Sequence, residues 1–82
     1  MGNDKKPAAA FGQVLRELRL AKGLTQDRLA ELASTERSHI SSLERAEKGP
    51  SLATILSLAD ALDVDAGDLV SRVADRLKTR KR

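Results

Sequence analysis

The chain has 82 residues and a net charge of +3, which fits one small domain. It has no cysteine, one histidine and one aromatic residue, which excludes disulfides, thiol chemistry, clustered metal ligands and binding of single strands by base stacking. No apolar run is long enough to span a membrane and no signal peptide is seen, so we expect a soluble cytoplasmic protein without a cofactor.

The spacing of apolar residues predicts three helices in the first half of the chain. The first ends near Gly23 and has apolar residues at i, i+3, i+4 and i+7, namely Phe11, Val14, Leu15 and Leu18. The second follows Thr25, a good N-cap residue, and is expected to bury Leu29, Ala30, Leu32 and Ala33. The third, residues 36–45, has only two large apolar side chains, Ile40 and Leu43.

Two further helices are predicted after Gly49-Pro50. Ser51 can cap the fourth, which is the most apolar and is therefore expected to be central, with Leu52, Ile55, Leu56, Leu58, Ala59 and Leu62. Asp65 begins the fifth, whose apolar stripe is Leu69, Val70, Val73, Ala74 and Leu77. Five apolar positions exceed what closing one small bundle needs. We therefore predict that this stripe, with part of the fourth helix, forms a homodimer interface, and the alternative is that the stripe lies entirely in the core.

These elements predict one all-α domain, a compact five-helix bundle, at residues 9–77. Residues 1–8 are expected to form a flexible N-terminal tail. Residues 78–82 form a basic C-terminal tail, expected to be a solvated end, with nonspecific phosphate binding as the alternative.

Charge is distributed unevenly along the chain. The basic tail holds four of the 15 basic residues, so residues 1–77 carry 11 basic against 12 acidic residues. Between Gly49 and Val70 there is no Lys or Arg, although four Asp lie there: Asp60, Asp63, Asp65 and Asp68. Bulk basicity is therefore weak evidence for a nucleic-acid partner, and this segregation of charge is better evidence.

The polar residues of the third predicted helix suggest why it has so little apolar surface. With Ile40 facing inward, the other side of the helix carries small polar and basic residues, namely Arg37, Ser38, Ser41, Ser42 and Arg45. Such a helix can enter the major groove of DNA, where Arg binds guanine O6 and N7 and Ser contacts bases or phosphates. The alternative is an ordinary solvated helix face.

Several sequence motifs resemble those of a known family. They are "LRxxKGLTQxxLAxxA" from Leu18, "ISSLE" from Ile40, "PSLxTIxxLAxAL" from Pro50 and a closing "DL". Over these roughly fifty residues the chain resembles the XRE helix-turn-helix family of Cro-type and phage-repressor-type regulators. The resemblance implies a lambda-repressor-like five-helix domain whose third helix reads the major groove, usually as a homodimer.

The resemblance also implies roles for individual residues. Gln26 would contact the DNA backbone and brace the reading helix, and the base-reading positions are held by Arg37, Ser38 and Ser42. The residues near phosphates or the groove edge would be Glu36, Ser41, Arg45 and Lys48. Arg19 and Glu44 match the family's internal ion pair.

Two positions in the turn depart from the family pattern. Ser34 stands where a glycine is usual and Thr35 where an aliphatic residue is usual. We expect Thr35 to cap the third helix, with Glu36 in its first turn. His39 is expected to be exposed to solvent, with a pH-sensitive DNA contact as the alternative.

The sequence therefore predicts a sequence-specific regulator of transcription that binds double-stranded DNA, a dimeric repressor or autoregulator on a near-palindromic operator. The alternative is a protein-interaction module, such as an antitoxin or adaptor, that binds a partner through its fifth helix. An enzyme is not expected, since no carboxylate pair, nucleophile–base set or glycine-rich phosphate loop is present.

Overall fold

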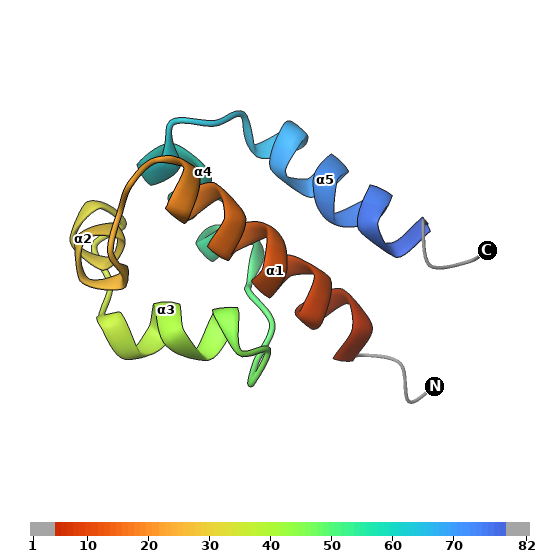
Figure 1. Ribbon diagram of the computed structural model, residues 1–82, viewed down its shortest axis with the longest axis horizontal. Coiled ribbons are helices and arrows are strands. Elements are labelled where there is room, and N and C mark those ends of the chain that lie inside the picture. The colour runs from red at the N-terminus through yellow and green to blue at the C-terminus, as the bar shows by residue number, and fades with distance from the viewer. Residues whose placement is uncertain (1–4, 79–82) are drawn as a thin grey trace.

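The computed structural model describes residues 5–78, and within them five helices and no strand are present. The helices are α1 (Lys5–Ala21), α2 (Gln26–Leu32), α3 (Arg37–Glu44), α4 (Leu52–Leu62) and α5 (Ala66–Lys78) (Figure 1). The predicted all-α five-helix bundle is confirmed. Three of the predicted N-caps are present, because Thr25, Ser51 and Asp65 each accept a hydrogen bond from a backbone N–H three residues later.

The first helix begins earlier than predicted. Residues 5–8 were expected to be a flexible tail but form the first turn of α1. Pro7 is tolerated there because the first-turn N–H groups of a helix have no partner within the helix. Lys78 is the last residue of α5, and the rest of both predicted tails, residues 1–4 and 79–82, lies outside the described residues.

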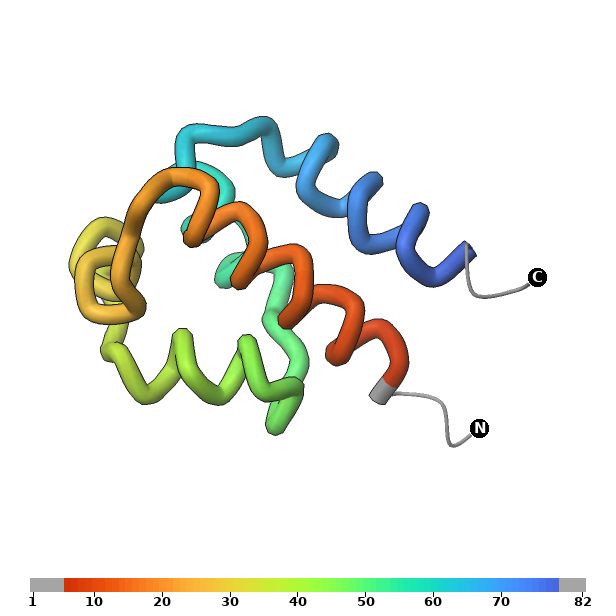
Figure 2. Tube along the Cα trace, viewed as in Figure 1, coloured from red at the N-terminus to blue at the C-terminus, as the bar shows by residue number. Residues whose placement is uncertain are grey.

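The central helix is α1, whereas the sequence favoured α4. α1 packs against α5 on one side and α3 on the other, and α1 and α5 run side by side in opposite directions (Figures 1 and 2). α4 buries Leu58, Ala59 and Leu62 but leaves Leu52 71% and Leu56 52% exposed. The apolar content of α4 therefore serves two surfaces, one in the core and one facing outward.

One core joins all five helices. Its fully buried side chains are Val14, Leu15, Leu29, Ile40, Leu43, Leu58, Leu62 and Leu69. Leu32 was expected to lie inside, but its side chain is exposed at the end of α2. The buried face of this end of the domain is formed by Leu29, Ala30 and Ala33, and it is narrower than the periodicity suggested.

Gly12 allows α1 and α3 to approach each other closely. A Cβ atom at this position would lie 2.5 Å from the carbonyl oxygen of Leu43 and 2.8 Å from that of Glu44. These two carbonyls belong to the last turn of α3, so the end of that helix rests directly on the backbone of α1. The sequence analysis missed this contact, although a glycine inside a predicted helix signals a packing reason.

The helices α1 to α4 end in the same kind of turn. One or two residues past each helix, a residue has a positive φ of 57–70°, and these residues are Gly23, Ser34, Ala46 and Asp63. Ser34 thus adopts the left-handed conformation that the usual glycine would take, and the turn between α2 and α3 keeps its form. In Figure 2, α2 is seen nearly end-on while α3 lies across the view, so the two helices cross steeply.

We predict that Gly12→Ala lowers the free energy of unfolding by about 1–3 kcal/mol, because the new Cβ meets backbone that cannot move aside freely. Gly49→Ala is the matched control, since its Cβ would meet only the Cβ of Ala8 at 3.8 Å. Urea unfolding of both variants measures the difference. Equal stability of Gly12→Ala and the parent would contradict the close packing of α1 and α3.

Candidate nucleic-acid interface

α3 lies at one edge of the molecule and has a buried and an exposed side (Figure 1). Ile40 and Leu43 are completely buried, whereas Arg37, Ser38 and Arg45 are exposed. Two apolar side chains therefore hold the helix in place. The polar side chains around its far side remain accessible to a partner.

A buried ion pair fixes the end of α3 to α1. Arg19 donates from Nε to Glu44 Oε2 at 2.7 Å and from Nη2 to Glu44 Oε1 at 3.1 Å. Nη1 of Arg19 donates to the carbonyl oxygen of Leu24 at 2.8 Å. The side chains are only 8% and 4% exposed, so the pair is shielded from solvent. A bidentate pair of this kind fixes both distance and orientation.

Gln26 extends this contact to the start of α3. Its Nε2 donates to Glu44 Oε1 at 3.0 Å, and its Oε1 accepts a weaker bond from Nη1 of Arg37 at 3.4 Å. The Nε atom of Arg37 also lies 3.5 Å from Oδ1 of Asp27. Gln26 therefore connects both ends of α3, and Asp27, which the sequence analysis missed, is the acidic neighbour of Arg37.

The last turn of α3 differs from the prediction at Ser41, which was expected to face outward. Ser41 is buried, and its Oγ accepts a hydrogen bond from Nη1 of Arg45 at 2.9 Å. Ser42 is half-buried instead of fully exposed. The spacing of apolar residues did not reveal this burial of a serine.

Glu47 is a second acidic residue that the sequence analysis missed. It accepts from Nε of Arg45 at 3.0 Å and from Oγ of Ser42 at 3.2 Å. The pKa of Glu47 is lowered, first by the hydrogen bond from Arg45 and then by that from Ser42. The sequence shows only that an acidic residue lies two positions after Arg45, and the direction of the turn between them comes from the structure.

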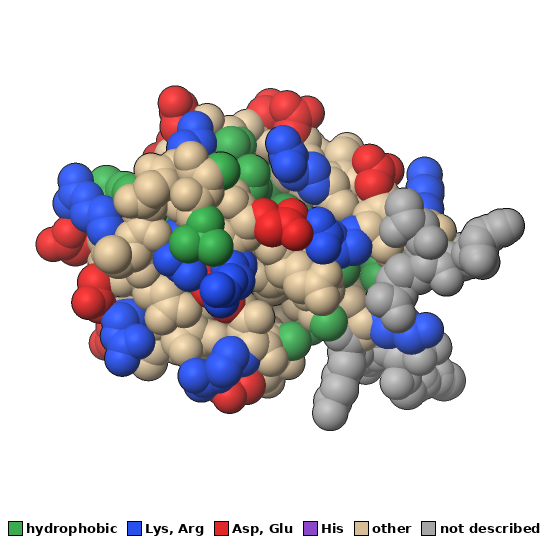
Figure 3. Space-filling model, in the orientation of Figure 1, with side chains coloured by type: hydrophobic (Ala, Val, Ile, Leu, Met, Phe, Trp, Pro, Cys, Tyr) green, Lys and Arg blue, Asp and Glu red, His purple; other side chains and the backbone are tan. Residues whose placement is uncertain are grey.

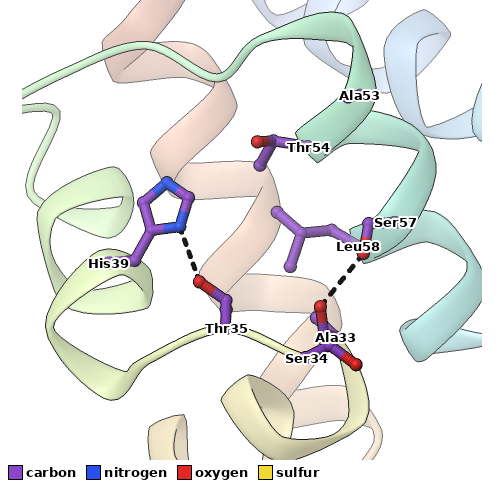
Figure 4. A pocket seen from close by; sticks show the side chains of 8 residues that line it. All are labelled: Ala33, Ser34, Thr35, His39, Ala53, Thr54, Ser57 and Leu58. Carbon is purple, nitrogen blue, oxygen red and sulfur yellow. Dashed lines mark hydrogen bonds between the residues drawn. The ribbon is translucent and has the colours of Figure 1, made fainter.

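The first turn of α3 also differs from the prediction. Glu36 occupies the N-cap position, without a capping hydrogen bond from its side chain, and not the first turn. Thr35 does not cap the helix, because its Oγ1 is hydrogen-bonded to Nδ1 of His39 at 2.9 Å. His39 is thus half-buried instead of exposed. It lies beside a cavity of about 260 Å³ between the α2–α3 turn and α4, where Ser57 Oγ donates to the carbonyl of Ala33 (Figure 4).

Charges of both signs surround the exposed side of α3. Figure 3 shows basic side chains along the lower edge of the molecule, where α3 lies in Figure 1, with acidic side chains close beside them. Arg37 and Arg45 each have an acidic neighbour, whereas Lys48 lies exposed in the following loop. The surface is therefore balanced in charge, in agreement with the nearly neutral body of the chain.

The predicted apolar stripe of α5 is divided between core and surface. Leu69 is completely buried and thus cannot meet a second copy, which corrects its assignment to the interface. Val73 and Leu77 are half-buried, whereas Val70, at 46% exposure, and Ala74 face outward. Val70 and Val73 line an apolar groove of about 440 Å³ together with Pro7, Ala8, Phe11, Gly49, Pro50 and Ile55.

Two other kinds of feature are missing from the part of the chain that the structure describes. No group of three or more His, Asp or Glu side chains is arranged there to hold a metal ion. None of the five helices is both long and apolar enough to cross a membrane.

Comparison with known proteins gives consistent matches. Residues 10–73 match the model of a helix-turn-helix domain family. The chain is 36% identical over 58 residues to control protein C.SmaI of Serratia marcescens, a match that covers 71% of this chain and 69% of that protein. It is 37% identical over 59 residues to the immunity repressor of Bacillus phage phi105, covering 72% of this chain but only 41% of the repressor.

A solved structure is similar in both sequence and fold. The restriction-modification controller protein C.AhdI of Aeromonas hydrophila superposes with a TM-score of 0.73 and is 48% identical. The match covers 76% of this chain and 94% of C.AhdI.

We predict that Glu44→Gln lowers the free energy of unfolding by about 3–5 kcal/mol, because Arg19 stays buried without a compensating charge. Glu31→Gln is the matched control, since Glu31 pairs with Arg28 on the surface, where the loss should stay below about 1 kcal/mol. Thermal and urea unfolding measure both changes. Equal small losses in the two variants would show that the pair does not brace α3.

Proposed function

This chain belongs to the XRE-type helix-turn-helix family of DNA-binding transcriptional regulators, and from that we propose that it binds a near-palindromic operator as a homodimer and represses transcription. The observation that carries the proposal is the way in which α3 packs on the domain. Ile40 and Leu43 are fully buried while Arg37 and Ser38 remain exposed at the start of the helix. The protein would act by binding in the cytoplasm, and not by catalysis.

Base reading is assigned to the exposed side of α3. Arg37 carries a planar guanidinium that can bind guanine O6 and N7 together, and Ser38 and Ser42 can contact bases at shorter range. Gln26 and Asp27 support Arg37 from α2, which limits the directions that its long side chain can take. The preference for guanine opposite Arg37 is therefore the first feature of the operator that we expect.

Contacts with the DNA backbone are assigned to the ends of this surface. Lys48 and Arg45 lie at the C-terminal end of α3, and Gln26 lies at the start of α2. Ser41 is buried and drops out of the proposed set, whereas Glu36 stays in it as a groove-edge residue that can accept a hydrogen bond from cytosine N4. Contacts of Gln26, Arg45 and Lys48 with phosphates position the helix, and those of Arg45 and Lys48 add a salt-dependent part to the affinity.

The proposed homodimer follows from how little DNA one α3 can read. A single reading helix covers a few base pairs, whereas two copies about 34 Å apart enter successive major grooves on one face of the duplex. The exposed apolar side chains Leu52 and Leu56 of α4 and Val70 of α5 are available for a contact between the two copies. A two-fold contact would bury these side chains against their copies.

The relatives suggest which kind of regulation to test first. Two of them are named as control or controller proteins and one as an immunity repressor. We propose by analogy that this chain represses a promoter that overlaps its operator, its own promoter included. The second candidate, a module that binds a different protein, rests on the same exposed surface of α4 and α5.

We predict that Arg37→Ala weakens binding to the selected operator by about 1–3 kcal/mol and relaxes the preference at one base pair, while the fold is retained. The operator is first selected with the parent protein from a random pool of duplexes. Arg72→Ala, which removes an exposed arginine of α5, is the control for net charge. Unchanged operator affinity in Arg37→Ala would exclude Arg37 as a base-reading residue, and a pool without enrichment would exclude the function.

We predict that Val70→Lys gives a folded monomer with much weaker operator binding, because a charge would have to be buried at the two-fold contact. Leu32→Lys is the control, since Leu32 is similarly exposed but lies on α2. Sedimentation at micromolar concentration measures the oligomeric state. A parent protein that is monomeric both free and on its operator would exclude the homodimer and favour the partner-binding alternative.

A further inference from the structure

Glu47 makes contacts that the reading of DNA does not require. Its two carboxylate oxygens accept from different side chains, Oε1 from Ser42 of α3 at 3.2 Å and Oε2 from Arg45, the residue after α3, at 3.0 Å. Both donors belong to the surface that we assign to DNA. One carboxylate thus takes the donors that two DNA acceptors would use.

The backbone holds Glu47 in this place. Ala46 has a positive φ of 60°, and the chain turns back so that the N–H of Glu47 donates to the carbonyl of Ser42 at 2.9 Å. The N–H of Ala46 donates to the carbonyl of Leu43 at 3.1 Å, which completes the turn. The fold therefore sets the backbone position of Glu47, from which its carboxylate reaches the side chains of Ser42 and Arg45.

A carboxylate and a phosphate compete for the same donors. Both present paired anionic oxygens that match the fork of an arginine. A phosphate that approaches Arg45 must displace Glu47 and then stays close to its negative charge. Exposed ion pairs are weak, and the side chains of Arg45 and Glu47 are 62% and 53% exposed, so the pair can open when other contacts with DNA are made.

We propose that Glu47 competes with DNA phosphate for Arg45, and so selects the operator over other DNA. This inference rests on the proposed function. On DNA of unrelated sequence, phosphate contacts supply nearly all of the affinity, and the carboxylate opposes them. On the operator, Arg37 and Ser38 can contact bases while the pair between Arg45 and Glu47 stays closed, so the affinity that they add does not require the displacement of Glu47. Glu47 therefore reduces nonspecific binding more than specific binding.

The test uses Glu47→Gln in the full chain, which keeps the size and a carbonyl acceptor but removes the charge. The matched control is Glu17→Gln, because Glu17 is an exposed carboxylate paired with Arg76, on the α1–α5 side of the molecule. Fluorescence anisotropy measures Kd for the operator selected by the parent and for a scrambled duplex of equal composition, between about 50 and 200 mM salt. Thermal melts verify that each variant is folded.

We expect Glu47→Gln to tighten binding to the scrambled duplex about three- to tenfold at the lowest salt. This is the size of effect expected when one negative charge that repels a nearby phosphate is removed. Binding to the operator should tighten less, so the ratio of the two Kd values falls. The gain should disappear in an Arg45→Ala background, and Glu17→Gln should leave both affinities as in the parent.

Three results would overturn the inference. Equal tightening by Glu17→Gln would show a simple effect of net charge. Weaker binding by Glu47→Gln would show that Glu47 positions Arg45 for DNA instead of competing with it. Unchanged binding would show that the contact is irrelevant. A parent protein that binds operator and scrambled duplex equally would instead contradict the proposed function itself.

Discussion

The buried ion pair between Arg19 and Glu44 is the contact on which the position of α3 depends. Burying a charge is costly unless all of its hydrogen-bonding groups find partners. Here each nitrogen of the guanidinium donates, to Glu44 or to the carbonyl of Leu24, and Glu44 also accepts from Gln26. The pair therefore specifies one arrangement of α1, the turn after it, α2 and α3. Two apolar anchors alone would leave an eight-residue helix freer to tilt.

Pairing of opposite charges also occurs on the exposed side of α3. Each arginine on this side has an acidic neighbour within the molecule, Asp27 for Arg37 and Glu47 for Arg45. These pairs are exposed and thus weak, so they direct the side chains without holding them firmly. A surface of this kind gains little from phosphates alone. Its affinity for DNA would depend more strongly on the bases that α3 meets.

α1 has a comparable role on the other side of the molecule. Gly12 brings it against the end of α3, while Gln13 and Glu17 accept hydrogen bonds from Arg76 of α5. α5 is thereby attached to the helix that also positions the candidate DNA surface. An apolar contact between two copies through Val70 would hold the two reading helices at a distance set by this rigid connection.

The sequence by itself determined the number and order of the helices and three of their N-caps, because periodicity and capping depend on residues a few positions apart. It also placed Arg37, Ser38 and Arg45 on the open side of α3, since Ile40 and Leu43 leave few other orientations. Only the tertiary structure decided that Ser41 is buried, that Leu69 lies in the core while Val70 is exposed, and that Glu47 reaches back to α3. These features depend on how helices distant in sequence cross at Gly12 and on the direction of each turn, which no local pattern contains.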